Sequence, residues 1–270
     1  MEGWFSTFVR GHKTVISTKD WHSQVAGYFP SMACSRRGVM GQDMFVAGID
    51  GCRGGWVNFK VDLTSLGTSV ELTDVPSILR NKPDDLAILA IDIPIGLLDG
   101  SRVCDKAARK LLGQPRGTSV FAAPCRAAVH AATYEEASAV NQQKTGRGLS
   151  QQAWGIVPKI KQVDDAITSD CQRWAFEVHP EVCFWALSQR RPMKHNKKTK
   201  DGVAERTALL RRIFPDIERH LVNRPPRVAA DDLLDAAVAA WTATRWNRDE
   251  AECVCPPERD NRGIEMTIYY

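Results

Sequence analysis

Acidic residues stand at the ends of three strand-like runs in this sequence. The apolar run that begins at Phe45 ends at Asp50 and is followed by a Gly-Cys-Arg-Gly-Gly turn. A second apolar run, over 86–94, carries Asp92 near its end, and Glu177 lies near the end of a third run over 173–181. Continuous apolar runs of this kind are typical of strands that are buried on both faces. Carboxylates at the ends of such strands lie where α/β sheets bind their ligands.

Further acids open the strongest amphipathic helix of the sequence, which is predicted over 231–241. Asp232 and Asp235 are three residues apart, and Asp231 and Asp235 are four apart, so either pair shares one face of the helix. If this helix packs across the sheet near Asp50, three or four carboxylates meet at one place. Carboxylates within ~4–6 Å of one another cannot all stay ionised without a cation.

A hard divalent cation with oxygen ligands, Mg²⁺ or Mn²⁺, would resolve this repulsion. Two such ions ~3.5–4 Å apart would hold the attacking water and the leaving oxygen in phosphodiester hydrolysis. Several of these acids also have an ordinary structural interpretation. Asp231 and Asp232 can cap their helix, and Glu177 can form a salt bridge within its strand. His179, beside Pro180, is more often a packed core histidine than a ligand.

The predicted strands and helices alternate in an order that favours an α/β fold. The sequence predicts strands over 45–50, 56–63, 68–73, 86–94 and 173–181, and an edge strand over 263–270. It predicts helices over 75–81, 102–112, 127–143, 151–170 (interrupted at Pro158), 182–188, 204–214, 217–223 and 231–241. The helical stretch over about 100–170 is expected to be an insertion that covers one end of the sheet.

Composition is ordinary for a globular protein, with 43% hydrophobic and 25% charged residues among 270. The net charge is +4, of which residues 1–43 contribute +2, so no global positive field argues for nucleic acid. Positive charge is concentrated in one basic run, which consists of Arg190, Arg191, Lys194, Lys197, Lys198 and Lys200. This run is either a phosphate-binding surface or a solvated, flexible loop.

Eight cysteines are spread along the chain without a CxxC pair. This pattern predicts free thiols in a reducing compartment, and we expect a cytoplasmic protein. No stretch approaches the ~20 apolar residues of a membrane span. Residues 1–43 lack sustained periodicity and a secretory signal, so we expect a weakly ordered N-terminal extension before a single domain over 44–270.

Several motifs follow one another in an order that is similar to a known family. They are GIDGCRGGW (48–56), IDIPIGL (91–97), Cys104-Asp105 with Ala108-Arg109, SVFAAPCR (119–126), GLSQQAWGIVPKI (148–160), EVHPE (177–181) and the DxxDA of Asp232–Ala236. From about Met44 to the C-terminus, the chain resembles the predicted RNase H-like nucleases of the domain-of-unknown-function family four-two-nine. Residues 1–43 have no counterpart in that family.

The resemblance implies an RNase H-like fold, a five-stranded mixed sheet with helices on both faces and the helical insertion after the fourth strand. In that superfamily the catalytic and metal-binding acids lie on the first strand, the fourth strand and the last helix. Asp50, Asp92 and either Asp232 or Asp235 match these positions. Glu177 lies on the predicted fifth strand and is a further candidate catalytic acid.

Candidate substrate-binding residues belong to the same family-like motifs. They are Arg53, Ser119, Arg126, Lys159, His179, Lys198 and Arg206. Arginine can bind phosphate through two parallel hydrogen bonds, whereas lysine acts as a point charge.

The sequence therefore predicts a metal-dependent nuclease that hydrolyses nucleic acid at a Mg²⁺ or Mn²⁺ site. Nucleic acid, either DNA or RNA, is the expected partner, with no membrane and no protein partner. Two alternatives stay open. Actin-like and sugar-kinase folds also place an Asp-Gly turn after the first strand to bind nucleotide phosphate, although they usually repeat it in a second similar domain. A catalytically silent nucleic-acid-binding module would keep only the salt-dependent affinity of the basic run.

Overall fold

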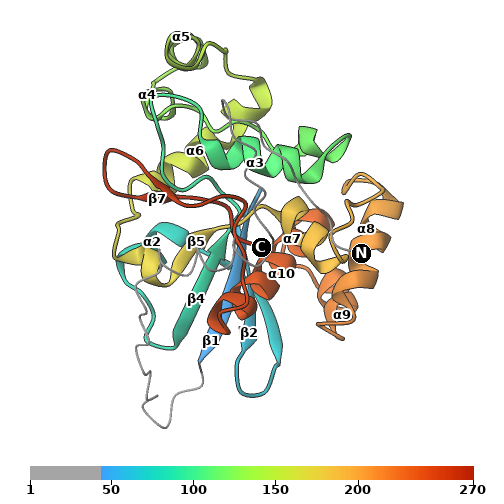
Figure 1. Cartoon of the computed structure of the whole chain (residues 1–270). Helices are drawn as coiled ribbons and strands as arrows, with labels where there is room; N and C mark the ends of the chain where they lie inside the picture. The colour runs from blue at the N-terminus through green and yellow to red at the C-terminus, as the bar shows by residue number, and fades with distance from the viewer. Residues whose placement is uncertain (1–43) are drawn as a thin grey trace, which may run out of the picture. The chain divides into compact units, whose positions relative to one another are not determined.

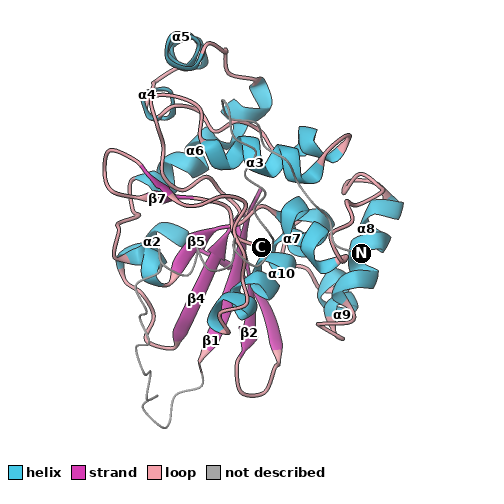
Figure 2. Ribbon diagram, viewed as in Figure 1, coloured by secondary structure: helices cyan, strands magenta, loops and turns pink. Residues whose placement is uncertain are grey.

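A computed structural model describes residues 44–270, and the predicted N-terminal extension lies outside this range. A five-stranded sheet in the order β3-β2-β1-β4-β5 forms the centre of the described domain (Figure 2). Its strands are β1 (Phe45–Cys52), β2 (Gly55–Asp62), β3 (Thr68–Thr73), β4 (Leu86–Ile91) and β5 (Ala175–Glu177). The first three strands are antiparallel, whereas β4 and β5 run parallel to β1 and to each other. The predicted five-stranded mixed sheet is confirmed, and it is consistent with an RNase H-like fold.

The central strand β1 is longer than the sequence predicts. Its antiparallel pairing with β2 continues past Asp50 until Cys52 faces Gly55. The expected break at Asp50 is wrong, because Gly51 and Cys52 pair with the start of β2 and the turn contains only Arg53 and Gly54. Glycine and an exposed arginine suit this two-residue hairpin turn.

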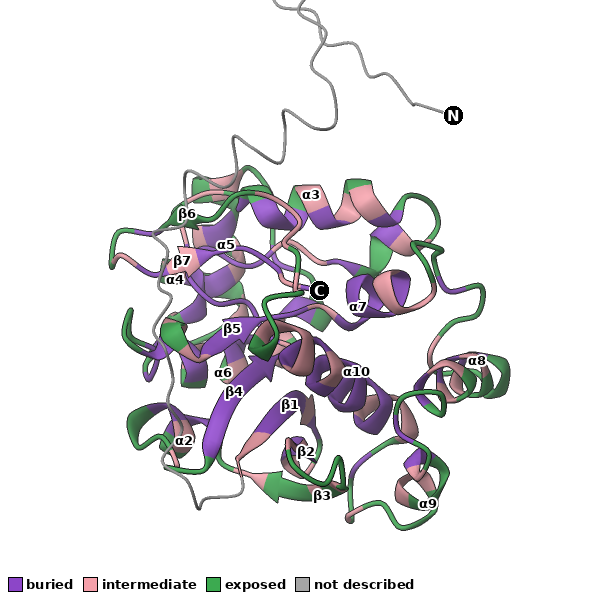
Figure 3. Cartoon of the chain, turned by 60° about the horizontal axis from the view of Figure 1, so that its bottom comes forward, coloured by how far each residue is buried: buried purple, intermediate pink, exposed green. Residues whose placement is uncertain are grey.

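Helices cover both faces of the sheet, as predicted, and each face has its own apolar core. On one face Val46 belongs to a core shared with the long helix α10 (Ala230–Asn247). On the other face Ala47 and Ile49 belong to a core shared with α2 (Val75–Arg80) and α6 (Gln151–Asp164). Alternate residues of a strand point to opposite faces, so β1 is buried on both sides. Figure 3 shows α10 lying along the buried strands β1 and β4.

The backbones of β1 and α10 approach closely at Gly48. A Cβ atom on Gly48 would lie 2.1 Å from the backbone nitrogen of Ala240 and 2.2 Å from the carbonyl oxygen of Ala236. No side chain fits in that space, and the facing residues of α10 are alanines. This contact fixes the position of α10 across the sheet.

The predicted helical insertion lies between β4 and β5. It comprises α3 (Val103–Leu112), η1 (Arg116–Ser119), α4 (Arg126–Val129), α5 (Tyr134–Thr145), α6 and η2 (Cys171–Arg173). The single helix expected over 127–143 is wrong, because Thr133 caps a new helix by accepting a hydrogen bond from the Glu136 N–H. Helix α6 continues through Pro158 without interruption and ends at Asp164.

The C-terminal part contains α7 (Pro180–Leu187), α8 (Lys200–Leu210), α9 (Ile217–Val222) and α10 (Figure 1). The strand predicted over 173–181 is shorter than expected, because Pro180 opens α7. The helix expected to begin at residue 204 begins at Lys200, where Thr199 accepts the N–H of Gly202. Helix α10 continues six residues beyond the predicted end at 241.

The segment predicted as an edge strand forms separate short pairings, which include an antiparallel bridge between Tyr269 and Cys253. Residues Glu265–Met266 (β7) pair with β6 (Glu258–Arg259) in a small hairpin, and Tyr269 forms an isolated parallel bridge with Val178 next to β5. Across residues 44–270, no helix is long and apolar enough to cross a membrane. The seven cysteines in this range are free, as predicted.

Candidate metal centre

The parallel register of β1 and β4 places Asp50 and Asp92 side by side. Ile49 lies opposite Ile91, and the Asp92 N–H donates to the carbonyl oxygen of Ile49 at 2.9 Å. The next residue on each strand is the aspartate, so both carboxylates leave the sheet at the same edge. Asp50 also accepts the N–H of Gly51 at 2.6 Å, which holds one of its oxygens in place.

Helix α10 brings Asp235 to the same edge. Gly48 packs against Ala236 and Ala240, and Asp50 points to the same face of β1 two residues further along. One carboxylate oxygen each of Asp50, Asp92 and Asp235 lies within 4.8 Å of the others. These three residues are the acid cluster.

Asp232 lies one turn before Asp235 and takes a different role. Its side chain accepts the N–H of Ala229 at 3.1 Å, so it caps the first turn of α10. Of the two helix positions that the sequence left open, the structure brings Asp235 into the cluster and does not bring Asp232.

Burial and mutual repulsion disfavour the ionised acids. Burial, followed by the neighbouring carboxylates of Asp92 and Asp235, raises the pKa of Asp50 well above its ordinary value. Burial and the Asp235 carboxylate raise the pKa of Asp92 to about 8. Burial also raises the pKa of Asp235. In the absence of a cation, the cluster therefore retains protons that ordinary aspartates lose.

One cation of the chain already contacts the acid cluster. The Lys197 ammonium lies 2.5 Å from Oδ2 of Asp235, and this carboxylate raises the pKa of Lys197. The sequence placed Lys197 in the basic run but not among the site residues. The helix cap at Thr199 is a sequence signal that locates Lys197 just before α8, but it does not reveal that the side chain turns toward Asp235.

The donor set fits a hard divalent metal ion. Three carboxylates supply oxygen ligands of the type that Mg²⁺ and Mn²⁺ prefer. Oδ1 of Asp235 is buried and finds no hydrogen-bond partner within residues 44–270. An unpartnered buried carboxylate oxygen costs stability unless a ligand satisfies it. A metal ion bound by Asp50, Asp92 and Asp235 would do so.

Glu177 lies opposite Ile91 on the neighbouring strand and is held in a buried ion pair with Arg102. Arg102 donates to both of its carboxylate oxygens, at 2.6 and 2.9 Å, and the Ile95 N–H donates at 2.7 Å. Arg102 also donates to Asp105 at 2.9 Å. Burial raises the pKa of Glu177 to about 7, although Arg102 opposes that shift. These contacts match the salt-bridge interpretation of Glu177, and it is not among the three clustered acids.

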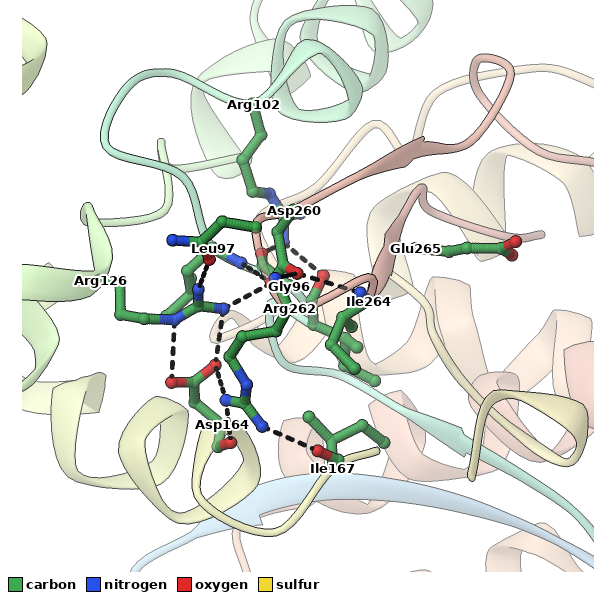
Figure 4. A network of polar contacts seen from close by, with 12 residues as sticks. Gly96, Leu97, Arg102, Arg126, Asp164, Ile167, Asp260, Arg262, Ile264 and Glu265 are labelled. Carbon is green, nitrogen blue, oxygen red and sulfur yellow. Dashed lines mark hydrogen bonds and ion pairs between the residues drawn. The ribbon is translucent and has the colours of Figure 1, made fainter. Parts of the chain in front are cut away.

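Two of the predicted phosphate-binding arginines are occupied by internal partners. Arg206 is fully buried, where it pairs with Glu181 and donates to the carbonyl oxygens of His195 and Gly202. Arg126 belongs to the network in Figure 4, in which it contacts Asp164 and Asp260.

That network attaches the C-terminal hairpin to α6. Arg262 donates to the carbonyl oxygens of Asp164 and Ile167 at 2.7 and 3.1 Å. Asp260 accepts the N–H groups of Arg262 and Ile264 from its own loop. All of these contacts are internal. Arg126, which belongs to the SVFAAPCR motif, therefore stabilises the fold.

The remaining candidates differ in exposure. Arg53, Ser119 and Lys198 are exposed to solvent. Lys159 packs against the β1–β2 hairpin, where it donates to the Gly55 carbonyl oxygen and lies 4.5 Å from the centre of the Trp56 ring. His179 is buried deeply enough to lower its pKa to about 4, and its Nδ1 finds no partner within residues 44–270.

The raised pKa of Asp92 predicts that the metal-free protein loses stability as pH rises. An unfolded Asp92, with its ordinary pKa of 3.8, releases a proton that the folded chain holds until about pH 8. The stabilisation from this proton is complete below about pH 4 and is lost as pH rises through about 8. Each unit of pKa difference corresponds to ~1.4 kcal/mol. Melting temperatures in EDTA should fall between mildly acidic and mildly alkaline buffer, and less so for Asp92→Asn.

The comparison between wild type and Asp92→Asn reports the proton held by Asp92 together with the effect of Asp92 on the pKa of Asp50. His179 and Glu177 are present in both proteins. If both proteins give parallel melting profiles across that pH range, Asp92 does not hold the proton.

Comparison with known proteins gives one family. The model of a protein family described as "Protein of unknown function (DUF429)" matches residues 48–260. This range contains all three residues of the acid cluster as well as Lys197. No curated protein and no solved structure matches the chain.

Proposed function

Because the chain belongs to the DUF429 family and joins three carboxylates at one sheet edge, we propose that it is a metal-dependent nuclease. The proposed reaction is hydrolysis of phosphodiester bonds in nucleic acid, as in the RNase H-like superfamily. The carrying observation is the convergence of Asp50, Asp92 and Asp235, whose oxygens lie within 4.8 Å although the residues are far apart in sequence.

Asp50, Asp92 and Asp235 would hold a Mg²⁺ or Mn²⁺ ion. Such an ion polarises a phosphoryl oxygen and lowers the pKa of a bound water. Rigid elements position the three carboxylates. The register of β1 and β4 fixes two of them, and α10 fixes the third. Ligands on strands and helices are held more accurately than ligands on loops. The Asp50 oxygen that accepts the Gly51 N–H is oriented before any ligand arrives.

Exposed positive side chains that follow Lys197 along the chain suit a phosphate backbone. A surface groove along α8 is lined by Lys198, Lys200 and Arg211, by Glu218, which pairs with Arg211, and by polar and small residues. Lys198, which lines the groove, directly follows Lys197, which contacts Asp235. Exposed lysines and arginines bind nucleic acid phosphates without base specificity. A reducing, cytoplasmic location suits the free thiols.

Nucleotide binding of the actin or sugar-kinase type receives less support. Those folds place two similar domains around the nucleotide. Residues 44–270 contain one five-stranded sheet and one two-stranded hairpin. In a nucleic-acid-binding module that binds no metal, nothing would offset the unfavourable burial of three neighbouring acids.

The test is cleavage of single-stranded DNA, single-stranded RNA, an RNA–DNA hybrid and a branched DNA, each with Mn²⁺, Mg²⁺ or EDTA. We expect cleavage of at least one substrate with metal and none in EDTA. A nucleoside triphosphate, tested in parallel by thermal shift, covers the alternative. Stabilisation by the triphosphate without cleavage of any nucleic acid would overturn the nuclease proposal.

A further inference from the structure

The acid cluster contains its own positive charge. The Lys197 ammonium pairs with Asp235 at 2.5 Å, and its side chain is 35% exposed whereas that of Asp235 is 1% exposed. Surface lysines are usually flexible and strongly hydrated. An ammonium that is drawn into a buried group of carboxylates is therefore a feature that the fold must stabilise.

The segment that carries Lys197 is held by α8. Glu205 accepts the backbone N–H groups of Lys194 and His195 at 2.9 and 3.0 Å. The buried Arg206 donates to the carbonyl oxygen of His195 at 3.2 Å and is itself anchored by Glu181. Two consecutive residues of α8 thus fix the backbone that leads into Lys197.

The residues after Lys197 are fixed as well. The side chain of Asn196 accepts the Lys198 N–H at 3.0 Å, and the Asn196 carbonyl oxygen accepts both the N–H and the hydroxyl of Thr199. A Cβ atom at Gly202 would lie 1.9 Å from the Asn196 carbonyl oxygen, so this loop packs directly on the first turn of α8. The loop prediction for the basic run therefore does not describe residues 194–199, which form a hydrogen-bonded support for one lysine.

Charge balance then sets how many metal ions the site takes. With all three acids ionised and Lys197 protonated, the cluster carries a net charge of −2, which one divalent ion neutralises. A second divalent ion would leave an excess of +2 next to the ammonium, where like charges repel strongly because the site is buried.

We propose that Lys197 is a tethered counter-cation that takes the place of a second metal ion, so that the acid cluster binds one divalent ion per chain. This inference deepens the proposed function and rests on its metal site. It differs from the two-ion arrangement that the sequence predicts. Lys197 acts here as a positioning residue, since its contact is with Asp235.

The experiment is a Mn²⁺ titration of the full-length protein without substrate, with free Mn²⁺ followed by electron paramagnetic resonance. We expect wild type to bind one ion per chain. In Lys197→Met, which keeps the length of the side chain but removes its charge, we expect a second ion to bind or the first to bind at least ~10-fold more tightly. Lys194→Met removes an exposed charge from the same segment and should match wild type.

Two ions in wild type, no ion in wild type, or identical titrations of wild type and Lys197→Met would each overturn the inference. The wild-type stoichiometry decides even if Lys197→Met fails to fold. Failure of the nuclease proposal is distinguishable: one ion bound with no cleavage rejects the nuclease alone, whereas cleavage with two ions bound rejects only the role of Lys197.

Discussion

Replacement of Asp50 by asparagine is expected to abolish metal-dependent cleavage and yet leave the metal-free protein as stable as wild type or more stable. Asparagine has the same shape and can still accept the Gly51 N–H, so the local fold is preserved. It cannot carry the negative charge that a hard cation requires. Loss of a partner that only supports a metal ligand already costs 10–100-fold in affinity or activity, so we expect a loss of at least ~100-fold.

Activity is expected to fall while stability does not. This combination distinguishes a metal ligand from a residue that supports the fold. Burial and the carboxylates of Asp92 and Asp235 disfavour an ionised Asp50. A neutral asparagine therefore avoids the cost of ionising this residue, or of keeping it protonated, in the metal-free state. We expect the melting temperature in EDTA to stay the same or rise, and the increase caused by Mn²⁺ to disappear. Thermal melting with and without Mn²⁺, together with the cleavage assay, measures both effects.

Asp249→Asn is the matched control. Asp249 is exposed after the end of α10, and asparagine tolerates its positive φ of 57°. This variant should cleave and melt like wild type. If Asp50→Asn keeps activity within a few-fold of wild type, or still gains stability from Mn²⁺, Asp50 is not a metal ligand.

Replacement of Arg102 by methionine is expected to lower the free energy of unfolding by several kcal/mol. Arg102 is 1% exposed and is the shared partner of Glu177 and Asp105. Removing it leaves two buried carboxylates without their cation. Breaking a buried ion pair in this way costs ~3–5 kcal/mol. The free energy of unfolding from urea titration measures the effect. A loss of this size is large enough to leave Arg102→Met unfolded at ambient temperature.

Two control variants test whether the loss of stability in Arg102→Met comes from burial and charge. Arg173→Met removes an arginine whose pairing with Asp170 is exposed, and it should cost less than ~1 kcal/mol. Glu177→Gln keeps an oxygen that can accept from Arg102, so it should destabilise less than Arg102→Met and retain cleavage activity. A stable but inactive Glu177→Gln would instead make Glu177 a catalytic acid.

The sequence predicts the strand acids because their positions depend on local patterns. Apolar runs set where β1 and β4 lie, and their parallel pairing forces Asp50 and Asp92 together. The choice between Asp232 and Asp235 is not local, because it depends on where α10 contacts β1. The close packing of Gly48 against α10 decides in favour of Asp235.

The arginines and Lys197 show what sequence patterns miss. A motif arginine has the same appearance whether it binds a phosphate or an internal carboxylate. Arg126 finds Asp260, 134 residues away, and Arg206 finds Glu181, 25 residues away. Lys197 reaches Asp235 across 38 residues. Such pairs are set by the tertiary arrangement, so only the three-dimensional structure separates a structural cation from a ligand-binding one.

The missing side chain at Gly48 has a consequence for the chemistry. Where two backbones touch, their separation is set by atomic radii and cannot drift as packed side chains can. The gap between the oxygens from β1 and α10 is therefore dictated by a residue that has no functional group of its own. Any larger residue at that position would push β1 away from α10 and separate the carboxylates of Asp50 and Asp235. The spacing of the acid cluster therefore depends on the absence of a side chain at Gly48.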